Sequence, residues 1–484
     1  MMTTMRRLLK AVPGQTLRKG AAIWLPFFVC AGLIVFPAMA ERVVPQSSGQ
    51  LQLSYAAVVK QAAPAVVNIY ARTVVRTQGY PSLFSNDFFS RFFGNIMPSQ
   101  PRERVQNSLG SGVVVRADGV IVTNSHVIHG AQQIVVALPD KRELEAEVLV
   151  DDDRADLAVL RVKTDEPLPY LEFADSDQVE VGDIILAIGN PFGVGQTVTS
   201  GIISATARTH VDDAKYQFFL QTDAAINPGN SGGAMVDING RLLGINTAIY
   251  SRDGGSQGIG FAIPANMVKA VVASALSEGK VVHPWLGLSV QDVTSDLAES
   301  LGLDRPMGVM VNKVHPKSSF QKAGVKSGDL ILSVDGHEVD DQGALMFRFA
   351  TKQVGKKATV ELMRNGKRRS ITVALIAAPE DPPRAEKTIT GNNPFSGATV
   401  GNLSPAYAEE LGVDDTLTGV IVSAVGGRSY ARQLGLQPGD IILSVNGQGI
   451  KRVADLDAAL EAGGRQWTIR ISRDGQVRSV TVQL

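Results

Sequence analysis

Short apolar runs, each about as long as a β-strand and separated by turn residues, fill the chain from Ala63 to Ile249. Runs of this length that are rich in Val, Ile and Leu and end at Gly, Asp or Asn are typical of strands. The expected strands include residues 112–115, 120–123, 134–138, 157–162 and 184–188. Ala117-Asp118-Gly119 and Ile238-Asn239-Gly240 lie between such runs and predict tight hairpin turns. The pattern therefore predicts an all-β barrel or sandwich.

A helical period follows this β-rich region. Apolar residues recur with helical spacing between Pro264 and Ser277, and Gly279 lies where such a helix would end. We expect this helix to close a domain that spans residues 50–278. Within that domain, residues 79–106 are rich in Phe, Pro, Ser and Asn without a steady period, which predicts a long insertion loop. Its clustered phenylalanines indicate local packing or contact with another subunit.

The C-terminal half contains an internal repeat. The run SGDLILSVDG at residues 327–336 returns as PGDIILSVNG at residues 438–447, an offset of 111 residues. Two copies of one small domain are therefore expected, over residues 283–377 and 397–484. The proline-rich stretch between them, residues 378–396, is predicted to be a linker.

The N-terminus carries basic residues followed by an apolar run from Ala21 to Ala38. Ala38-Met39-Ala40 fits a small-residue cleavage site, so residues 1–40 are predicted to be a signal peptide for export. An uncleaved membrane anchor is the alternative, because this segment is about long enough to span a bilayer. The chain has one cysteine, Cys30, and it lies inside this segment, which excludes a thiol nucleophile in the mature protein.

Composition narrows the function classes. The chain has 484 residues, enough for several hydrophobic cores, and its 44% hydrophobic residues favour a folded soluble protein. Lys and Arg number 47, as do Asp and Glu, so the net charge is zero and no nucleic acid partner is expected. No motif for a metal or an organic cofactor occurs, because the mature chain lacks cysteine and has no HExxH spacing. We predict neither.

The sharpest chemical motif is Gly229-Asn230-Ser231-Gly232-Gly233. Glycines around a serine allow a tight turn that projects the hydroxyl while backbone N–H groups converge nearby. The same pattern matches the nucleophile elbow of α/β-hydrolases, which requires a strand–turn–helix context with its acid and histidine later in the chain. Here β-type sequence follows Ser231 and the candidate partners precede it.

Those partners are His126, which closes an apolar strand pattern, and Asp156, which opens one. The chain order His126, Asp156, Ser231 is that of chymotrypsin-like enzymes. In that chemistry the serine attacks the peptide carbonyl, the histidine takes and returns the proton, and the aspartate orients the imidazole. Alone, each residue is more typical of a turn or a strand end. Together they predict the catalytic triad of a serine endopeptidase, with His129 as the rival base.

The sequence resembles the HtrA/Do-type family of bacterial periplasmic serine proteases. The resemblance rests on TNSHV at 123–127, DLAVL at 156–160 and QTDAAINPGNSGGA at 221–234, followed by the two repeats. It implies a mainly β fold, in which a chymotrypsin-like double β-barrel protease domain precedes two PDZ domains. It also implies a periplasmic, ATP-independent endopeptidase that degrades unfolded or damaged envelope proteins and has chaperone activity. Homotrimers or larger cages of trimers, with peripheral membrane association at most, are part of the same expectation.

The resemblance also suggests residue roles. The backbone N–H groups of Gly229, Asn230 and Ser231 would form the oxyanion hole, and Arg208 would be the regulatory sensor of PDZ occupancy. Residues 190–195, 208–216 and 250–258 would be the activation, sensor and specificity loops.

A peptide-binding loop is implied at the start of the first PDZ domain. Its residues are Trp285, Leu286, Gly287 and Leu288, which would capture a C-terminal carboxylate while the peptide adds a strand to the sheet. His283-Pro284-Trp285 departs from the Arg-Gly-Tyr often found there. The second repeat has the poorer match Val400-Gly401-Asn402-Leu403, which indicates a structural or assembly role.

Two other functions remain open at this stage. A catalytically silent PDZ chaperone or scaffold would bind without cleaving, although all three triad positions are filled. An esterase of the α/β-hydrolase class would require strands alternating with helices between residues 110 and 250, and the periodicity there does not show this pattern.

Overall fold

The computed structural model describes residues 54–75, 104–190, 196–208, 218–227, 229–249, 256–279, 281–415, 417–473 and 475–483. The chain divides into two compact units, Met1–Ser54 and Tyr55–Leu484, and nearly all described residues belong to the second. The predicted signal peptide and most of the phenylalanine-rich insertion lie outside the described residues. Within the described ranges, no helix combines the length and apolar character needed to cross a membrane.

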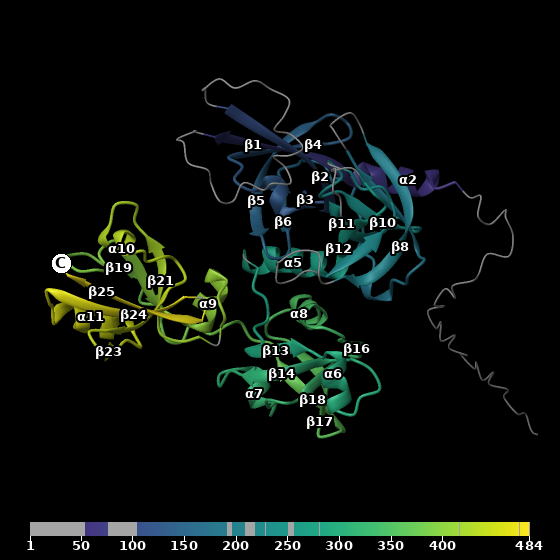
Figure 1. Cartoon of the computed structure of the whole chain (residues 1–484). Coiled ribbons are helices and arrows are strands. Elements are labelled where there is room, and N and C mark those ends of the chain that lie inside the picture. Colours follow the sequence, from purple (N-terminus) through teal and green to yellow (C-terminus); the bar gives the residue numbers. More distant parts are fainter. Residues whose placement is uncertain are drawn as a thin grey trace, which may run out of the picture. The chain divides into compact units, whose positions relative to one another are not determined.

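The region predicted to be a protease domain begins with a closed six-stranded antiparallel barrel in the order β1-β2-β3-β6-β5-β4 (Figure 1). Helix α2 (Ala56–Ala62) and a 3-10 turn (Ala63–Ala65) lead into it. Its strands are β1 (Val66–Val75), β2 (Arg104–Arg116), β3 (Val120–Thr123), β4 (Gln133–Ala137), β5 (Glu143–Asp152) and β6 (Leu157–Val162). The one-turn helix α4 (Ser125–Ile128) follows β3 directly.

A second closed barrel follows, in the order β10-β11-β12-β9-β8-β7. Its strands are β7 (Ile184–Gly189), β8 (Thr197–Arg208), β9 (Phe219–Thr222), β10 (Ala234–Asp237), β11 (Leu242–Ile249) and β12 (Gly260–Pro264). A 3-10 turn (Ser176–Gln178) precedes it, and helix α5 (Ala265–Glu278) closes the region. Gly279 ends α5 in the left-handed conformation, at φ 65°, as its position in the sequence predicts. The predicted β-barrel architecture is confirmed.

The first repeat forms a sheet in the order β13-β14-β15-β17-β18, with the short strand β16 paired to β15. Its strands are β13 (Leu288–Asp292), β14 (Val309–Val314), β15 (Leu330–Val334), β16 (His337–Glu338), β17 (Lys357–Arg364) and β18 (Lys367–Ala374). Its helices are α6 (Ser295–Ser300), α7 (Ser319–Lys322) and α8 (Gln342–Ala350). Side chains of Thr294, Ser318 and Asp341 cap the first turns of these helices, which satisfies backbone N–H groups there.

The second repeat has the same plan with one additional strand. Its sheet runs β19-β20-β21-β22-β24-β25, and β23 pairs with β22. The strands are β19 (Lys387–Thr388), β20 (Ala398–Asn402), β21 (Val420–Val425), β22 (Ile441–Val445), β23 (Gln448–Gly449), β24 (Gln466–Arg473) and β25 (Gln476–Gln483). The helices are α9 (Pro405–Leu411), α10 (Tyr430–Gln433) and α11 (Val453–Glu461).

The predicted linker is shorter in the structure than in the sequence analysis. Lys387 and Thr388 pair with β20, and Ile389 and Phe395 are buried in the core of the second repeat. The prolines and charges of residues 378–396 suggested an open chain, but its second half contains apolar residues that the core takes up. The connecting segment therefore ends by Pro383, whose carbonyl already accepts from the side-chain amide of Asn402 at 2.8 Å.

Both repeats anchor their C-terminal hairpin in the same way. Arg364 in β17 donates to the buried carboxylate of Asp329 at 2.5 Å, and Arg473 in β24 donates to Asp440 at 2.6 Å. The two aspartates are 1% and 0% exposed. Each aspartate comes from the Gly-Asp of the repeated motif, so the motif explains why both domains hold the hairpin at the same place.

Candidate active site

His126 and Asp156 lie next to each other because strands β3 and β6 are hydrogen-bonded neighbours. Thr123 at the end of β3 pairs with Ala158 near the start of β6. His126 Nδ1 lies 2.8 and 2.9 Å from the two carboxylate oxygens of Asp156, and the backbone N–H of His126 donates to the same carboxylate at 3.1 Å. The sequence pattern predicts that His126 closes a strand. It lies instead in helix α4, one turn beyond that end.

Two further residues hold Asp156 in place. Its backbone has φ 50°, a left-handed conformation that is unfavourable for a residue with a side chain. The buried amide of Asn124 donates to the carbonyl of Asp156 at 2.9 Å, and the hydroxyl of Thr247 donates to its carboxylate at 2.5 Å. Neither role is predicted from the sequence. Asn124 belongs to the TNSHV motif, whereas Thr247 lies in β11 of the other barrel and carries no local signal.

The charge state of Asp156 follows from these contacts. Burial would raise the pKa of its carboxyl, but the charge of His126 and the hydrogen bonds from His126 and Thr247 outweigh burial, so the pKa is lowered. A carboxylate that stays ionised accepts the proton on Nδ1 of His126. Nε2 is then left as the basic nitrogen, which is the tautomer that general-base catalysis requires.

Ser231 lies in a tight turn in which a side chain on the neighbouring glycine would clash with the first barrel. Gly232 has φ 80°, and a Cβ atom on it would lie 2.1 Å from the carbonyl oxygen of Ser111. The backbone of Ser231 is fixed to the first barrel, since its carbonyl accepts from the N–H of Ser111 at 2.8 Å. The turn is therefore clamped between the two barrels, as expected for a nucleophile that must be held rigidly.

Thr247 connects the serine with the aspartate. The hydroxyl of Ser231, a residue that is 8% exposed, donates to the backbone carbonyl of Thr247 at 3.1 Å. The side chain of the same threonine donates to Asp156. The structure therefore brings all three residues predicted as a triad to one place, with His126 and Asp156 from the first barrel and Ser231 from the second.

The residues predicted for the oxyanion hole already take part in hydrogen bonds that shape the serine turn. The N–H of Asn230 donates to the carbonyl of Asn227 at 3.0 Å, and the carbonyl of Gly229 accepts from the hydroxyl of Ser111 at 2.7 Å. The same hydroxyl accepts from the backbone N–H of Asn190 at 2.9 Å. Ser111 therefore ties the serine turn to the beginning of the segment predicted to be the activation loop.

The other predicted sites are described only in part. Arg208 ends strand β8, and its side chain lies outside the described residues, as do residues 191–195, 209–217 and 250–255 of the three predicted loops. His129, the rival base, is exposed just after helix α4.

The predicted peptide-binding loop lies beside an edge strand. Trp285 and Leu286 are only 6% and 8% exposed, Gly287 has φ 60°, and Leu288 begins strand β13, the last strand of its sheet. In the second repeat the corresponding strand β20 is covered by β19. Within the part of the chain that the structure describes, a peptide adding to the sheet therefore finds an open edge at β13 and an occupied one at β20.

Family descriptions match three parts of the chain. A trypsin-like peptidase domain matches residues 110–245, and PDZ domains match residues 284–375 and 421–473. The predicted combination of a chymotrypsin-like protease and two PDZ domains is confirmed. The α/β-hydrolase alternative is wrong, because residues 110–245 form barrels of antiparallel strands.

Named relatives cover most of the chain. A probable periplasmic serine endoprotease DegP-like of Marinomonas sp. is 40% identical over 431 residues, covering 86% of this chain and 90% of that protein. The periplasmic pH-dependent serine endoprotease DegQ of Escherichia coli is 38% identical over 411 residues, covering 84% and 87%.

Solved structures agree with these relatives. The HtrA-type protease AlgW with a decapeptide is 45% identical, with a TM-score of 0.51, and covers 68% of this chain and 100% of its own. The same protease with a tripeptide is 43% identical, with a TM-score of 0.52, and covers 68% and 99%. With its protease barrels and PDZ repeats, the chain is a serine endopeptidase and belongs to the HtrA family, which includes DegP and DegQ.

Proposed function

We propose that His126, Asp156 and Ser231 are the catalytic triad of this endopeptidase. The observation that carries the proposal is the contact chain from His126 through Asp156 to Thr247 and Ser231. In this mechanism Ser231 attacks the scissile carbonyl and His126 Nε2 takes its proton and returns it to the leaving amine. Asp156 stays ionised and stabilises the protonated imidazole. Asn124 and Thr247 are positioning residues that act through Asp156.

The oxyanion would be stabilised by backbone N–H groups of Gly229, Asn230 and Ser231. Asn230 can serve only after its N–H leaves the carbonyl of Asn227, to which it now donates. The hydroxyl of Ser111 contacts both this turn and Asn190, so movement of the predicted activation loop is a direct way to reorganise the turn. Activation by loop movement, with Arg208 as the sensor, fits this arrangement.

The proposed substrates are unfolded or damaged proteins of the bacterial periplasm, cleaved without ATP or cofactor. The export segment predicted at residues 1–40 and the names of the periplasmic relatives support this location. Peptide termini would bind at the first PDZ domain, along β13. Holding of unfolded chains as a chaperone, and assembly into trimers or cages of trimers through the phenylalanine-rich insertion, complete the proposal.

The test compares the mature chain with its Ser231→Ala variant on an unfolded protein substrate, with and without a peptide that has a free C-terminus. The variant is expected to lose cleavage by about a millionfold, as in other Ser-His-Asp enzymes. Stimulation of the unmodified chain by the peptide would support control through the PDZ domain. Equal cleavage by both forms would exclude Ser231 as the nucleophile. Absence of cleavage by either form, with suppression of substrate aggregation by both, would favour the chaperone alternative.

A further inference from the structure

The first PDZ domain carries a group of exposed cations around the anchor of its C-terminal hairpin. The guanidinium of Arg364 donates to the buried carboxylate of Asp329 at 2.5 Å and to the carbonyl of Gly324 at 2.7 Å. The backbone N–H of Lys326 donates to the same carboxylate at 2.8 Å. Lys367 is the cross-strand partner of Arg364. Lys326 and Lys367 therefore both lie next to the Arg364–Asp329 pair.

Two more cations adjoin this pair. Lys322 ends helix α7, which lies against strand β18, and Lys326 follows it after one short turn. Arg369 follows Lys367 by two residues in β18, so both side chains point to the same face of the sheet. On that face Leu362, the cross-strand partner of Arg369, enters the core. We call Lys322, Lys326, Lys367 and Arg369 the lysine patch.

The charge of the lysine patch is exposed and is not neutralised by a neighbour. All four residues are exposed, and among the described residues none of them takes part in an ion pair. The carboxylate of Asp329 is 1% exposed and is already paired with Arg364. A Cβ atom built on Gly324, Gly328 or Gly366 would meet no other atom within 4 Å. The loops that carry the patch therefore project into solvent and do not form the walls of a groove.

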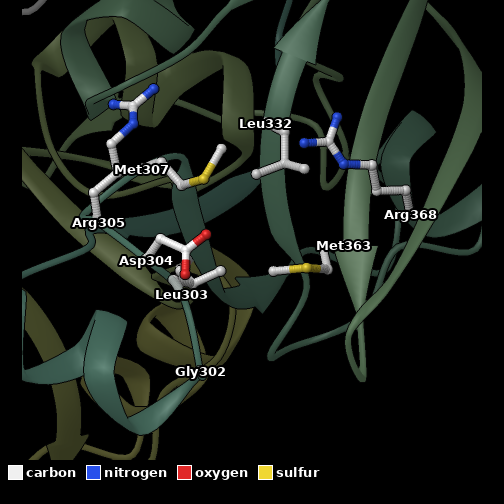
Figure 2. A pocket seen from close by; sticks show the side chains of 8 residues that line it. All are labelled: Gly302, Leu303, Asp304, Arg305, Met307, Leu332, Met363 and Arg368. Atoms are coloured by element: carbon white, nitrogen blue, oxygen red, sulfur yellow. The ribbon is translucent and has the colours of Figure 1, made fainter.

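Arg368, the remaining cation of the basic run in β18, belongs to the other face of the sheet. It is the cross-strand partner of Met363, and Figure 2 shows both beside a cavity that Asp304 and Arg305 also line. The adjoining cavity, which Arg368 lines as well, adds three carboxylates: Glu338, Asp340 and Glu361. Carboxylates therefore offset the charge of Arg368, and we do not count it in the lysine patch.

The second PDZ domain shows that the fold does not require these lysines. Its hairpin anchor is the same, because Arg473 donates to a buried aspartate and to a glycine carbonyl as Arg364 does. Glutamine nevertheless replaces every lysine of the patch, in the pairs Lys322 and Gln433, Lys326 and Gln437, and Lys367 and Gln476. Arg478 keeps the place of Arg369, and Arg432 is a further cation nearby in the sequence. The lysines of the first domain therefore call for a role outside the fold.

We propose that the lysine patch binds the surface of a bilayer that contains anionic phospholipids. Lysine is a flexible point charge and lacks the planar fork by which arginine holds a single carboxylate or phosphate. Projecting, flexible cations without a groove suit the many mobile phosphates of a bilayer surface better than one bound peptide. Each basic residue close to such a surface strengthens binding by about fivefold, and the contributions of several residues multiply.

The inference goes beyond the proposed cleavage of unfolded proteins and depends only on the proposed periplasmic location, where a bilayer faces the protein. The protein would lie on the membrane through the first PDZ domain and would not cross it. Because the contact is electrostatic, it would be reversible and sensitive to salt.

The test uses the chain without residues 1–40 and with Ser231→Ala, so that neither the apolar N-terminal run nor self-cleavage affects the result. Binding is measured at low salt by co-sedimentation with vesicles of phosphatidylcholine alone, or of equal parts phosphatidylcholine and phosphatidylglycerol. The protein is expected to bind only the vesicles with phosphatidylglycerol, and raised salt should release it. The triple variant Lys322→Gln, Lys326→Gln, Lys367→Gln should weaken binding by about a hundredfold. It should fold, because the second domain carries glutamine at the same positions.

Two further triple variants separate the patch from general effects of charge. Lys163→Gln, Lys356→Gln, Lys357→Gln removes the same charge from exposed lysines outside the patch and should change binding by less than about threefold. Lys322→Arg, Lys326→Arg, Lys367→Arg keeps the charge of the patch and should also stay within about threefold, because a bilayer surface attracts either cation.

Any of four results would overturn the proposal. They are no binding to vesicles with phosphatidylglycerol, equal losses from the two glutamine variants, a loss from the arginine variant as large as that from glutamine at the same positions, or binding to the soluble polyanion heparin without binding to vesicles. Ser231-dependent cleavage of an unfolded protein is measured separately, without vesicles. Failure of the lysine patch therefore leaves the proposed protease function standing, and the reverse also holds.

Discussion

The two PDZ domains share a scaffold and differ where a ligand would touch them. In both domains a buried aspartate holds an arginine of the C-terminal hairpin, and a left-handed residue, Asp335 or Asn446, forms the turn after the central strand. Among the described residues, the first domain leaves its β13 edge open. The second covers the corresponding edge with β19. The difference teaches that the repeated motif specifies the fold, and that the positions outside the motif determine binding.

The largest expected effect tests the shared scaffold. Arg364→Leu leaves the carboxylate of Asp329 buried without its partner, and we expect the first domain to lose about 3–5 kcal/mol of unfolding free energy. Arg473→Leu should do the same to the second domain through Asp440. Hydrogen exchange read separately for each domain measures both losses, because each domain opens as a local unit.

Two further variants make this test specific. Adding Asp329→Leu to Arg364→Leu removes the unpaired charge and should recover part of the lost stability. Arg478→Leu, an exposed arginine of β25, should cost less than about 0.5 kcal/mol. If one domain tolerated the loss of its arginine and the other did not, the two scaffolds would not be equivalent.

The next effect concerns the open and the covered edge. A peptide with a free C-terminus should bind at one site per chain, along β13, and Leu288→Glu should weaken it about tenfold, which corresponds to 1.4 kcal/mol. Leu288 is the cleaner probe of the loop, because Trp285 is only 6% exposed and its replacement would also disturb packing. Isothermal titration calorimetry gives both the affinity and the number of sites.

Thr399→Glu is the matched control in the second domain. Thr399 lies one residue beyond Ala398, the counterpart of Leu288 in the sheet register, and it is also half-buried and pairs with Thr388 of β19. It should leave peptide affinity unchanged. Two sites per chain, or an equal loss from Thr399→Glu, would show that β19 does not close the second edge.

The smallest expected effect is the loss of unfolding free energy at low pH, and it concerns the turn after the central strand that the two domains share. Burial of the Asp335 carboxyl would raise its pKa, but hydrogen bonds from Lys352 and the N–H of Thr359 outweigh burial, and the pKa is lowered from its usual value of 3.8. A lowered pKa means that the carboxylate stabilises the domain fully above that usual value, and that this stabilisation is lost as the pH falls through the lowered value. Asn446 accepts from Thr468 at the same place and does not titrate.

We therefore expect Asp335→Asn to make the unfolding free energy of the first domain less dependent on pH below about 4. The change at neutral pH should stay under about 1 kcal/mol, because the side chain is 35% exposed and solvent screens its ion pair with Lys352. Denaturation curves at pH 3, 4 and 7 for the variant and the unmodified chain provide the measurement. Parallel curves for the two proteins would remove Asp335 as the source of acid sensitivity.

Much of the fold could be predicted because its signals are local. The apolar runs marked strands such as 120–123 and 157–162, the spacing before Gly279 marked α5, and the 111-residue offset marked the two repeats. The residues proposed for the triad were found in the same way, from short motifs in a known order. Family descriptions and relatives then bore out the protease and PDZ domains.

What could not be predicted depends on pairing between distant segments. Thr247 contacts Asp156 only because the two barrels meet at the site, and nothing in its own neighbourhood in the sequence marks it. Residues 387–395 look like linker, since β19 gains its partner only when β20 is in place.

Because a single aspartate anchors each C-terminal hairpin, one hairpin can replace the other without loss of its anchor. Residues 357–374 and 466–483 are antiparallel pairs of equal length, each fixed by one arginine at the same position. A chimera that carries the first hairpin in the second domain keeps its anchor and gains the basic run Lys367-Arg368-Arg369. Exchange of this one short segment is thus enough to move the basic run from one domain to the other. After duplication of a domain, such an exchange is a short route to two domains with different ligands.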